Sequence, residues 1–252
     1  MKVLYGFEYR RGVSVIHRID PRSKMIYVIL FTALTVYFVN PLVLLLVLSS
    51  SFPIVAISKI GRRWAQSIKG SLFFIAFIFI FNFIGIVWAT GSVWDAVISG
   101  VSMSIRFIAL ISIFSVFFLT TSPEDLTQSM VQMRIPYDYA LTFNMAMRFV
   151  PTLSREAQII MDAQKSRGLE MEKGNLIQRI KNYIPVLIPL IISSFRRAEL
   201  VADAMESRAF GASKKRTSLY VLAMRNRDVL FILISVISFL LLLSLKLVFG
   251  IP

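Results

Sequence analysis

The stretch that decides the fold class reads SLFFIAFIFIFNFIGIVWA and runs from Ser71 to Ala89. It is rich in Phe and Ile, and it is close to the roughly 20 apolar residues that a helix needs to cross a bilayer. Trp88 lies at its end, where interfacial aromatic side chains are typical. The stretch therefore predicts a membrane-spanning helix.

The composition of the whole chain agrees with this prediction. Of its 252 residues, 56% are hydrophobic and 17% are charged, whereas soluble domains carry about 25% charged residues. The net charge of +14 is explained by cationic loops beside apolar spans, since no aromatic-basic RNA motif accompanies it. We therefore expect an integral membrane protein that contacts the lipid bilayer and binds no nucleic acid.

Five apolar runs predict five membrane spans. They are Met25–Val39, Leu42–Ser58, Ser71–Ala89, Ala96–Leu119 and Val229–Phe249. Basic loops alternate with loops that lack Lys and Arg, so the positive-inside rule places the N-terminus in the cytoplasm and the C-terminus outside. The alternative is that the first two runs form one re-entrant unit.

The charge pattern divides the chain into three parts. Residues 1–119 form the membrane domain, with an N-terminal cytoplasmic segment and four spans, and residues 228–252 form the last transmembrane helix. Residues 120–227 carry 16 Lys and Arg and 10 Asp and Glu, and we expect them to be cytoplasmic coupling helices. The predicted fold is an all-α membrane protein with a cytoplasmic domain of long crossing helices between the fourth and last spans.

Local signals place the helices of the cytoplasmic part. Ser122-Pro-Glu-Asp125 predicts a helix start, because it offers a capping serine, a proline at the first position and acids in the first turn. Thr152–Arg167 is strongly helical in composition. Leu176–Arg208 predicts a helix of about 50 Å, which Pro185 and Pro189 are expected to bend.

Two similar segments end these two long helices. They read Asp162-Ala-Gln-Lys-Ser-Arg-Gly168 and Asp203-Ala-Met-Glu-Ser-Arg-Ala209, and their arginines, Arg167 and Arg208, are 41 positions apart. A single arginine at the carbonyl end of a helix is favoured by about 0.3–1 kcal/mol and needs no partner. The repetition instead indicates two equivalent signals, which suit a partner with two equivalent pockets, such as a dimer.

No catalytic chemistry is visible in the sequence. The chain has no cysteine and one histidine, His17, and it lacks a phosphate-binding P-loop, a zinc-protease motif and a nucleophile elbow. We therefore expect no enzyme activity, no bound cofactor and no metal site. Arg106 lies inside the fourth predicted span, where an arginine is costly and usually faces protein or water. We assign it no role.

The chain resembles the transmembrane T component of energy-coupling factor transporters, a family related to the cobalt-transport membrane protein. The residues that carry the resemblance are Ser14-Val-Ile-His17-Arg-Ile-Asp20-Pro21-Arg22-Ser-Lys24, Ser166-Arg167-Gly168 and Ser207-Arg208-Ala209. Ser166 departs from the alanine that is usual in the family. Ser207 and Ala209 replace the usual small residue and glycine of the second triplet, so the backbone fit at Ala209 is of particular interest.

The resemblance implies a function in coupling. Two cytoplasmic ABC ATPase subunits would each receive one helix end, with Arg167 and Arg208 meeting acidic groups and their small neighbours allowing close approach. ATP and Mg²⁺ would be bound by those ATPases and not by this chain. A small substrate-binding integral membrane subunit would receive the motion and import a vitamin or a transition metal across a prokaryotic plasma membrane.

The alternative function is that of a conventional ABC importer permease, which itself forms the substrate pathway. The coupling loop of such permeases begins Glu-Ala-Ala and has a glycine six residues after the glutamate. Here Glu156-Ala-Gln158 begins similarly, but Asp162 stands at the position of that glycine. A permease also usually supplies one coupling segment per subunit, whereas this chain has two.

Overall fold

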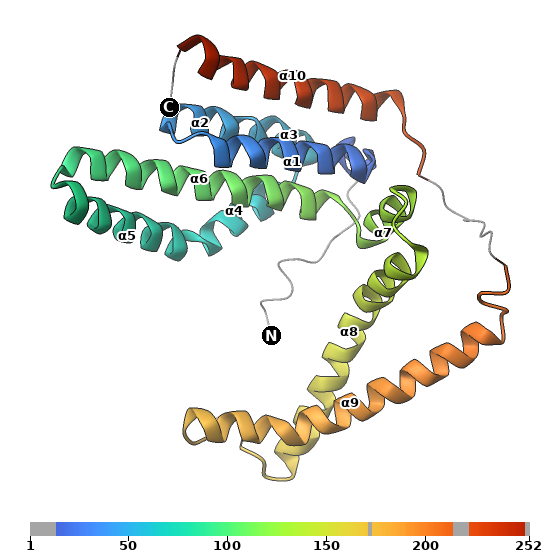
Figure 1. Ribbon diagram of the computed structural model, residues 1–252. Helices are drawn as coiled ribbons and strands as arrows, with labels where there is room; N and C mark the ends of the chain where they lie inside the picture. Colours follow the sequence, from blue (N-terminus) through green and yellow to red (C-terminus); the bar gives the residue numbers. More distant parts are fainter. Residues whose placement is uncertain (1–13, 171–172, 214–221, 250–252) are drawn as a thin grey trace. The chain divides into compact units, whose positions relative to one another are not determined.

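The computed structural model describes residues 14–170, 173–213 and 222–249, with side chains up to Ser244. This part of the chain is helical, with one 3-10 turn and no strand (Figure 1). The elements are η2 (Ile16–Arg18), α1 (Pro21–Tyr37), α2 (Pro41–Ser49), α3 (Ser51–Ser58), α4 (Gly61–Gly70), α5 (Leu72–Thr90), α6 (Val93–Thr120), α7 (Pro123–Gln132), α8 (Tyr137–Ser166), α9 (Leu176–Glu206) and α10 (Asn226–Phe249).

The described residues form two compact units. Residues 14–133 and 222–249 make up the first, which we call the membrane unit, and residues 134–213 make up the second, the α8/α9 unit. Helix α7 packs on α1 and belongs to the membrane unit. The predicted boundaries near residues 120 and 228 concern the side of the membrane on which each part lies, and they stay a prediction.

The all-α membrane fold is confirmed. Within the described residues, four stretches are long and apolar enough to cross a membrane, and they are Pro41–Ser58, Leu72–Thr90, Val93–Thr120 and Asn226–Ser244. The predicted first span falls on α1, whose 17 residues cover only about 25 Å. Helix α1 nevertheless packs against α2, α6 and α10. The count of five spans and their orientation stay predictions.

The second predicted span is divided into α2 and α3 at Ser50. Pro53 follows the break, and a proline cannot donate the helical hydrogen bond to the carbonyl four residues earlier, which here belongs to Ser49. At the break, the hydroxyl of Ser50 donates to the Val47 carbonyl at 2.6 Å. The proline therefore explains why one apolar run makes two helices.

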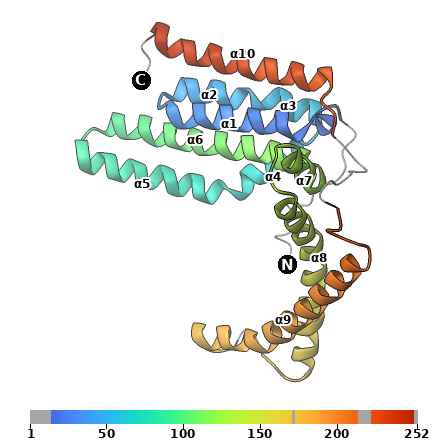
Figure 2. The same ribbon diagram turned by 45° about the vertical axis from the view of Figure 1, so that its right-hand side comes forward.

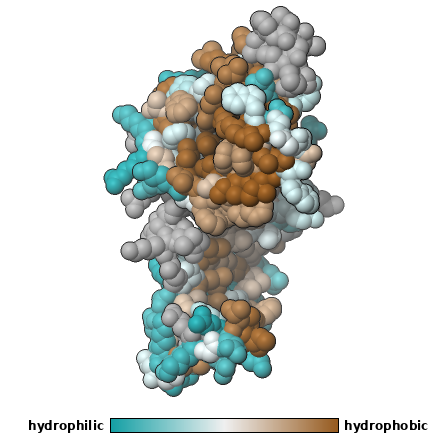
Figure 3. All heavy atoms as spheres, turned by 90° about the vertical axis from the view of Figure 1, so that its left-hand side faces the viewer, coloured by the Kyte–Doolittle hydropathy of each residue, from teal (hydrophilic) through white to brown (hydrophobic). Residues whose placement is uncertain are grey.

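The core of the membrane unit lies around α1. Its most deeply buried large side chains are Phe31, Leu34, Phe38, Leu44 and Ile113. Helix α5 has no buried residue and packs mainly on α6, where the ring of Phe79 lies close to Gly100. Apolar side chains cover much of the membrane unit on the face in Figure 3, as expected of a surface in contact with lipid.

The basic segment between the second and third predicted spans forms helix α4, where a loop was predicted. Trp64 accounts for the difference, because its indole Nε1 donates to Ser112 Oγ of α6 at 2.8 Å. Lys59, Arg62 and Lys69 are exposed in or beside this helix. The segment is thus an amphipathic helix that packs one face on the membrane unit.

The predicted start of α7 is confirmed. Ser122 Oγ accepts a hydrogen bond from the Asp125 amide at 3.0 Å, and Pro123 is the first helical residue.

Helices α8 and α9 are long and pack on each other, and Figure 2 shows them crossing. Helix α9 continues through Pro185 and Pro189. Because Pro189 has no N–H, it leaves the Pro185 carbonyl free, and Gln164 Nε2 of α8 donates to that carbonyl at 3.4 Å. The proline thus creates an acceptor that joins the two helices.

Candidate docking site for partner subunits

Helix α8 ends in a Schellman motif formed by the residues around Arg167. The Gly168 amide donates to the Lys165 carbonyl at 2.9 Å, and the Leu169 amide donates to the Gln164 carbonyl at 3.0 Å. Gly168 has a φ of 86°, which lies in the left-handed region that this motif requires. The helix therefore stops abruptly and leaves Arg167 exposed at its tip.

Helix α9 ends in the same way around Arg208. The Ala209 amide donates to the Glu206 carbonyl at 2.8 Å, and the Phe210 amide donates to the Met205 carbonyl at 3.0 Å. Ala209 has a φ of 57°, so it takes the left-handed conformation although it carries a Cβ. The two repeated segments thus have one backbone geometry, with alanine at the second end in the position of Gly168.

All six residues predicted to dock on a partner lie at these two helix ends and are exposed. They are Ser166, Arg167, Gly168, Ser207, Arg208 and Ala209. The serine hydroxyls turn back to their own helices, from Ser166 to the Asp162 carbonyl and from Ser207 to the Ala204 carbonyl, both at 3.0 Å. Among these six residues the guanidinium groups are therefore the charged groups available to a partner, and their role in docking stays a prediction.

The ends lie on opposite sides of the helix pair. The ring of Phe210, just past Arg208, is 6.5 Å from the ring of Tyr137, the first residue of α8. Arg167 follows the other end of α8, whose 30 residues span about 45 Å. The two arginines are therefore far apart and cannot serve one common pocket.

An ion pair that sequence reasoning missed lies between the two ends. Arg197 Nη2 contacts Glu156 Oε2 at 2.6 Å, and both side chains are less than one third exposed. These positions are 41 residues apart, the same offset that separates Arg167 from Arg208. Arg167 lies 11 residues after Glu156, and Arg208 lies 11 residues after Arg197. This separation is about 16 Å along each helix. The offset of 41 residues between the repeated segments is the sequence signal that points to this pair.

The helix pair is therefore close to symmetric about this ion pair. Glu156 packs opposite Arg197, and Gln164 packs opposite Pro185, so the two helices run antiparallel through this region. An antiparallel pair with equivalent residues at its centre has a local two-fold relation between its ends. The α8/α9 unit thus presents two like tips in two opposed directions.

Exchanges at the two left-handed positions should have opposite effects on stability. We expect Gly168→Ala to lower the free energy of unfolding by about 1 kcal/mol and Ala209→Gly to raise it by somewhat less. The reason is that the left-handed conformation is unfavourable for alanine, which has a Cβ, and not for glycine. No atom lies within 4 Å of a Cβ added at Gly168, so no clash contributes. Thermal unfolding of the purified protein measures both changes.

Gly70→Ala is the matched control, since Gly70 ends α4 in open space without a positive φ. An equal loss of stability in Gly70→Ala and Gly168→Ala would contradict the assignment.

Arg106, which the sequence left without a role, binds inside the membrane unit. Its Nη2 donates to the Phe38 carbonyl, just past the end of α1, at 2.7 Å. A cation at the carbonyl end of a helix is favourable, so this contact accounts for an arginine in an apolar span.

The N-terminal segment Ser14–Lys24 is ordered on the membrane unit. His17 Nδ1 lies 2.7 Å from Ser14 Oγ, and burial, with the Lys24 ammonium as a second cause, lowers the pKa of the imidazole. No group of three or more His, Cys, Asp or Glu residues that could hold a metal ion occurs in the described part of the chain.

Comparisons with known proteins identify the family. The profile of the cobalt transport protein family (CbiQ) matches residues 12–219. The energy-coupling factor transporter transmembrane protein EcfT of Staphylococcus aureus is 34% identical over 85% of this chain and 87% of its own length. EcfT of Streptococcus equi is 33% identical over 97% of both chains, and EcfT of Bacillus subtilis is 30% identical over 88% of this chain and 90% of its own.

These relatives cover nearly the whole chain, including both helix ends. Their names favour the energy-coupling factor interpretation over that of a conventional permease. The members of this family are multi-pass membrane subunits of bacterial transporters and are not enzymes. The chain belongs to the cobalt transport protein family, as a transmembrane component of an energy-coupling factor transporter.

Proposed function

We propose that this chain transmits ATP-driven motion from two cytoplasmic ABC ATPase subunits to a small substrate-binding integral membrane subunit. The tips of α8 and α9, centred on Arg167 and Arg208, would each dock in one ATPase. The imported substrate would be a vitamin or a transition-metal ion. ATP and Mg²⁺ would bind to the ATPases, and this chain would hold no cofactor.

The observation that carries the proposal is the equivalence of the two tips. Arg167 and Arg208 lie in the same Schellman geometry, and each follows its residue of the central Glu156–Arg197 pair by 11 positions. Two like tips in a two-fold relation match a two-fold partner, because a symmetric dimer offers one surface twice. Two copies of an ATPase, or two closely related ones, have that symmetry.

The chemistry of the tips indicates what the partner pockets contain. An arginine presents a planar, permanently charged fork that pairs with a carboxylate through two hydrogen bonds. The small residues beside it, Ser166 and Gly168 at one tip and Ser207 and Ala209 at the other, leave room for the helix end to enter a groove. Closure of the ATPase dimer would then change the separation of the tips and turn α8 against α9.

Co-purification tests the proposal. The tagged chain, expressed with its native genetic neighbours, should retain an ATPase pair and a small membrane protein. The complex in liposomes should take up radioactive cobalt(II) or one of a panel of labelled vitamins (thiamine, riboflavin, folate and biotin) when ATP is present. A homodimer of this chain that transports with ATPases alone would contradict the proposal and favour a conventional permease.

A further inference from the structure

The chain leaves the membrane unit after α7 and returns to it at Leu222. Three contacts hold the exit and the return in place, and two of them involve the segment Asp20–Lys24 at the start of α1. We call this segment the α1 anchor. Its residues belong to the N-terminal signature, to which the proposed docking of α8 and α9 gives no role.

The first contact lies at the junction of α6 and α7, where the segment that leads to the exit begins. Lys24 Nζ donates to the carbonyl of Thr120, the last residue of α6, at 2.8 Å. Lys24 is 4% exposed and Thr120 is 1% exposed. The terminal carbonyls of a helix lack partners within the helix, and the negative end of the helix dipole favours a cation there. The lysine thus ties α1 to the point where α6 gives way to α7.

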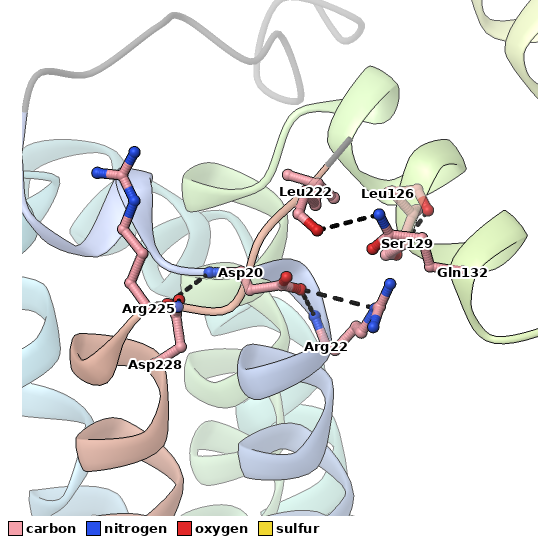
Figure 4. Close-up of polar contacts among 8 residues, drawn as sticks. All are labelled: Asp20, Arg22, Leu126, Ser129, Gln132, Leu222, Arg225 and Asp228. Atoms are coloured by element: carbon pink, nitrogen blue, oxygen red, sulfur yellow. Dashed lines mark hydrogen bonds and ion pairs between the residues drawn. The ribbon is translucent and has the colours of Figure 1, made fainter. Parts of the chain in front are cut away.

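The second contact holds the return. Asp228 Oδ1 accepts from the Asp20 amide at 2.9 Å, and Asp228 Oδ2 accepts from the Arg225 amide at 2.7 Å (Figure 4). Asp228 lies in the first turn of α10 and is 3% exposed. One carboxylate therefore joins the start of α10 to the start of α1, across 208 residues of sequence.

The third contact joins the exit to the return directly. Gln132, the last residue of α7, donates from Nε2 to the Leu222 carbonyl at 3.0 Å (Figure 4). Leu222 is the first described residue of the returning chain. Beyond Gln132, the first residue of the α8/α9 unit, Arg134, has a φ of 65°. Helix α7 therefore lies before the point at which the chain passes from one unit to the other.

Stability alone does not explain these buried charges. Removing a charge from water is costly, and apolar residues of similar volume often stabilise a protein equally well or better. What these charges add, through their hydrogen bonds to backbone groups, is one defined position for the segments that they join. Here they join the two segments through which any force on the α8/α9 unit must pass.

We propose that Lys24 and Asp228 are positioning residues for energy coupling. They hold the exit and return segments as one frame, so that a displacement of the α8/α9 unit reaches α6 and α10 together. This inference rests on the proposed coupling function and extends it to the membrane end of the pathway.

The first test locks the frame. The chain has no cysteine, so in Gln132→Cys with Leu222→Cys the two introduced thiols are the only ones of this chain that a short bismaleimide can join in the complete transporter. ATP-driven uptake of the cobalt(II) or vitamin substrate in liposomes should be unchanged, because the two segments need not separate. The single-cysteine variants, treated alike, control for modification. A loss of uptake on cross-linking alone would overturn the proposal.

The second test loosens the frame. An asparagine at position 228 can accept from only one of the two amides, so we expect Asp228→Asn to lower uptake per ATP hydrolysed by about tenfold. Assembly and ATP hydrolysis should persist, which a merely structural role would not predict. The cross-link between positions 132 and 222 should restore part of the loss. Arg227→Gln, at the exposed neighbour, should have no effect.

Unchanged uptake per ATP in Asp228→Asn would overturn the proposal, and if that variant does not assemble, the cross-linking test still decides. Failure of the coupling function itself would be recognised separately, because Arg167→Glu and Arg208→Glu would then transport normally.

Discussion

Reversing the charge of Arg167 or Arg208 to glutamate is expected to abolish ATP-driven uptake while the protein remains in the membrane. Both side chains are exposed, and neither has an ion-pair partner in the described part of the chain. Such surface changes leave the fold intact. At a partner interface, loss of one member of a buried charge pair costs about 2–5 kcal/mol, and a glutamate facing a carboxylate adds repulsion. Uptake and ATP hydrolysis of the reconstituted complex measure the effect.

The near-symmetry of the tips makes this prediction more specific. The two single variants should be impaired to a similar degree, because each removes one of two equivalent docking contacts. Arg196→Glu is the matched control, since it reverses an exposed arginine on α9, 12 residues before Arg208, and it should transport normally. Full uptake by the double variant Arg167→Glu, Arg208→Glu would refute the docking assignment.

The helix ends were predictable from the sequence because their signals are local. Gly168 and the capping residues of α7 act within a few positions of themselves, and the structure has both helix boundaries where these residues predict them. The left-handed conformation of Ala209 was not predictable in this way, because an alanine rarely adopts it. Only its equivalence with Gly168 in the repeat indicates that the second end has the same shape.

The contacts that join distant segments were not predictable from single residues. Asp228 reads as one acid in a basic stretch before a span, and its partner Asp20 is 208 positions away. Helix α7 reads as part of the cytoplasmic stretch, yet it packs with the membrane unit. The charges of α4 predict a basic loop, whereas the helical periodicity of its residues is the sequence signal for an amphipathic helix. Asp228 and α7 depend on packing partners that local propensity does not specify, whereas the periodicity of α4 is a local signal.

The ion pair between Glu156 and Arg197 should set the angle between the two docking tips. It joins equivalent positions of the repeat, so a change there moves both tips at once. The contact is partly buried, at 2.6 Å, and Arg197 Nη1 is buried without a hydrogen-bond partner in the structure. A partly exposed pair contributes only about 1 kcal/mol to stability, so the protein should stay folded when the pair is lost. The angle between the two tips, however, is then no longer fixed.

We therefore expect Glu156→Arg to lower uptake by about tenfold, as a shift of about 1.4 kcal/mol in docking would, and to lower the melting temperature only slightly. Arg197→Glu should do the same. The exchanged pair, Glu156→Arg with Arg197→Glu, should recover most of the uptake, because it restores opposite charges at the centre of the helix pair. Glu199→Arg, at an exposed glutamate of α9, provides the control. Two outcomes would contradict this prediction: normal uptake by the single variants, or uptake by the exchanged pair that is no higher than that of the single variants. Either outcome would show that the tips are held by apolar packing of α8 on α9 and not by this ion pair.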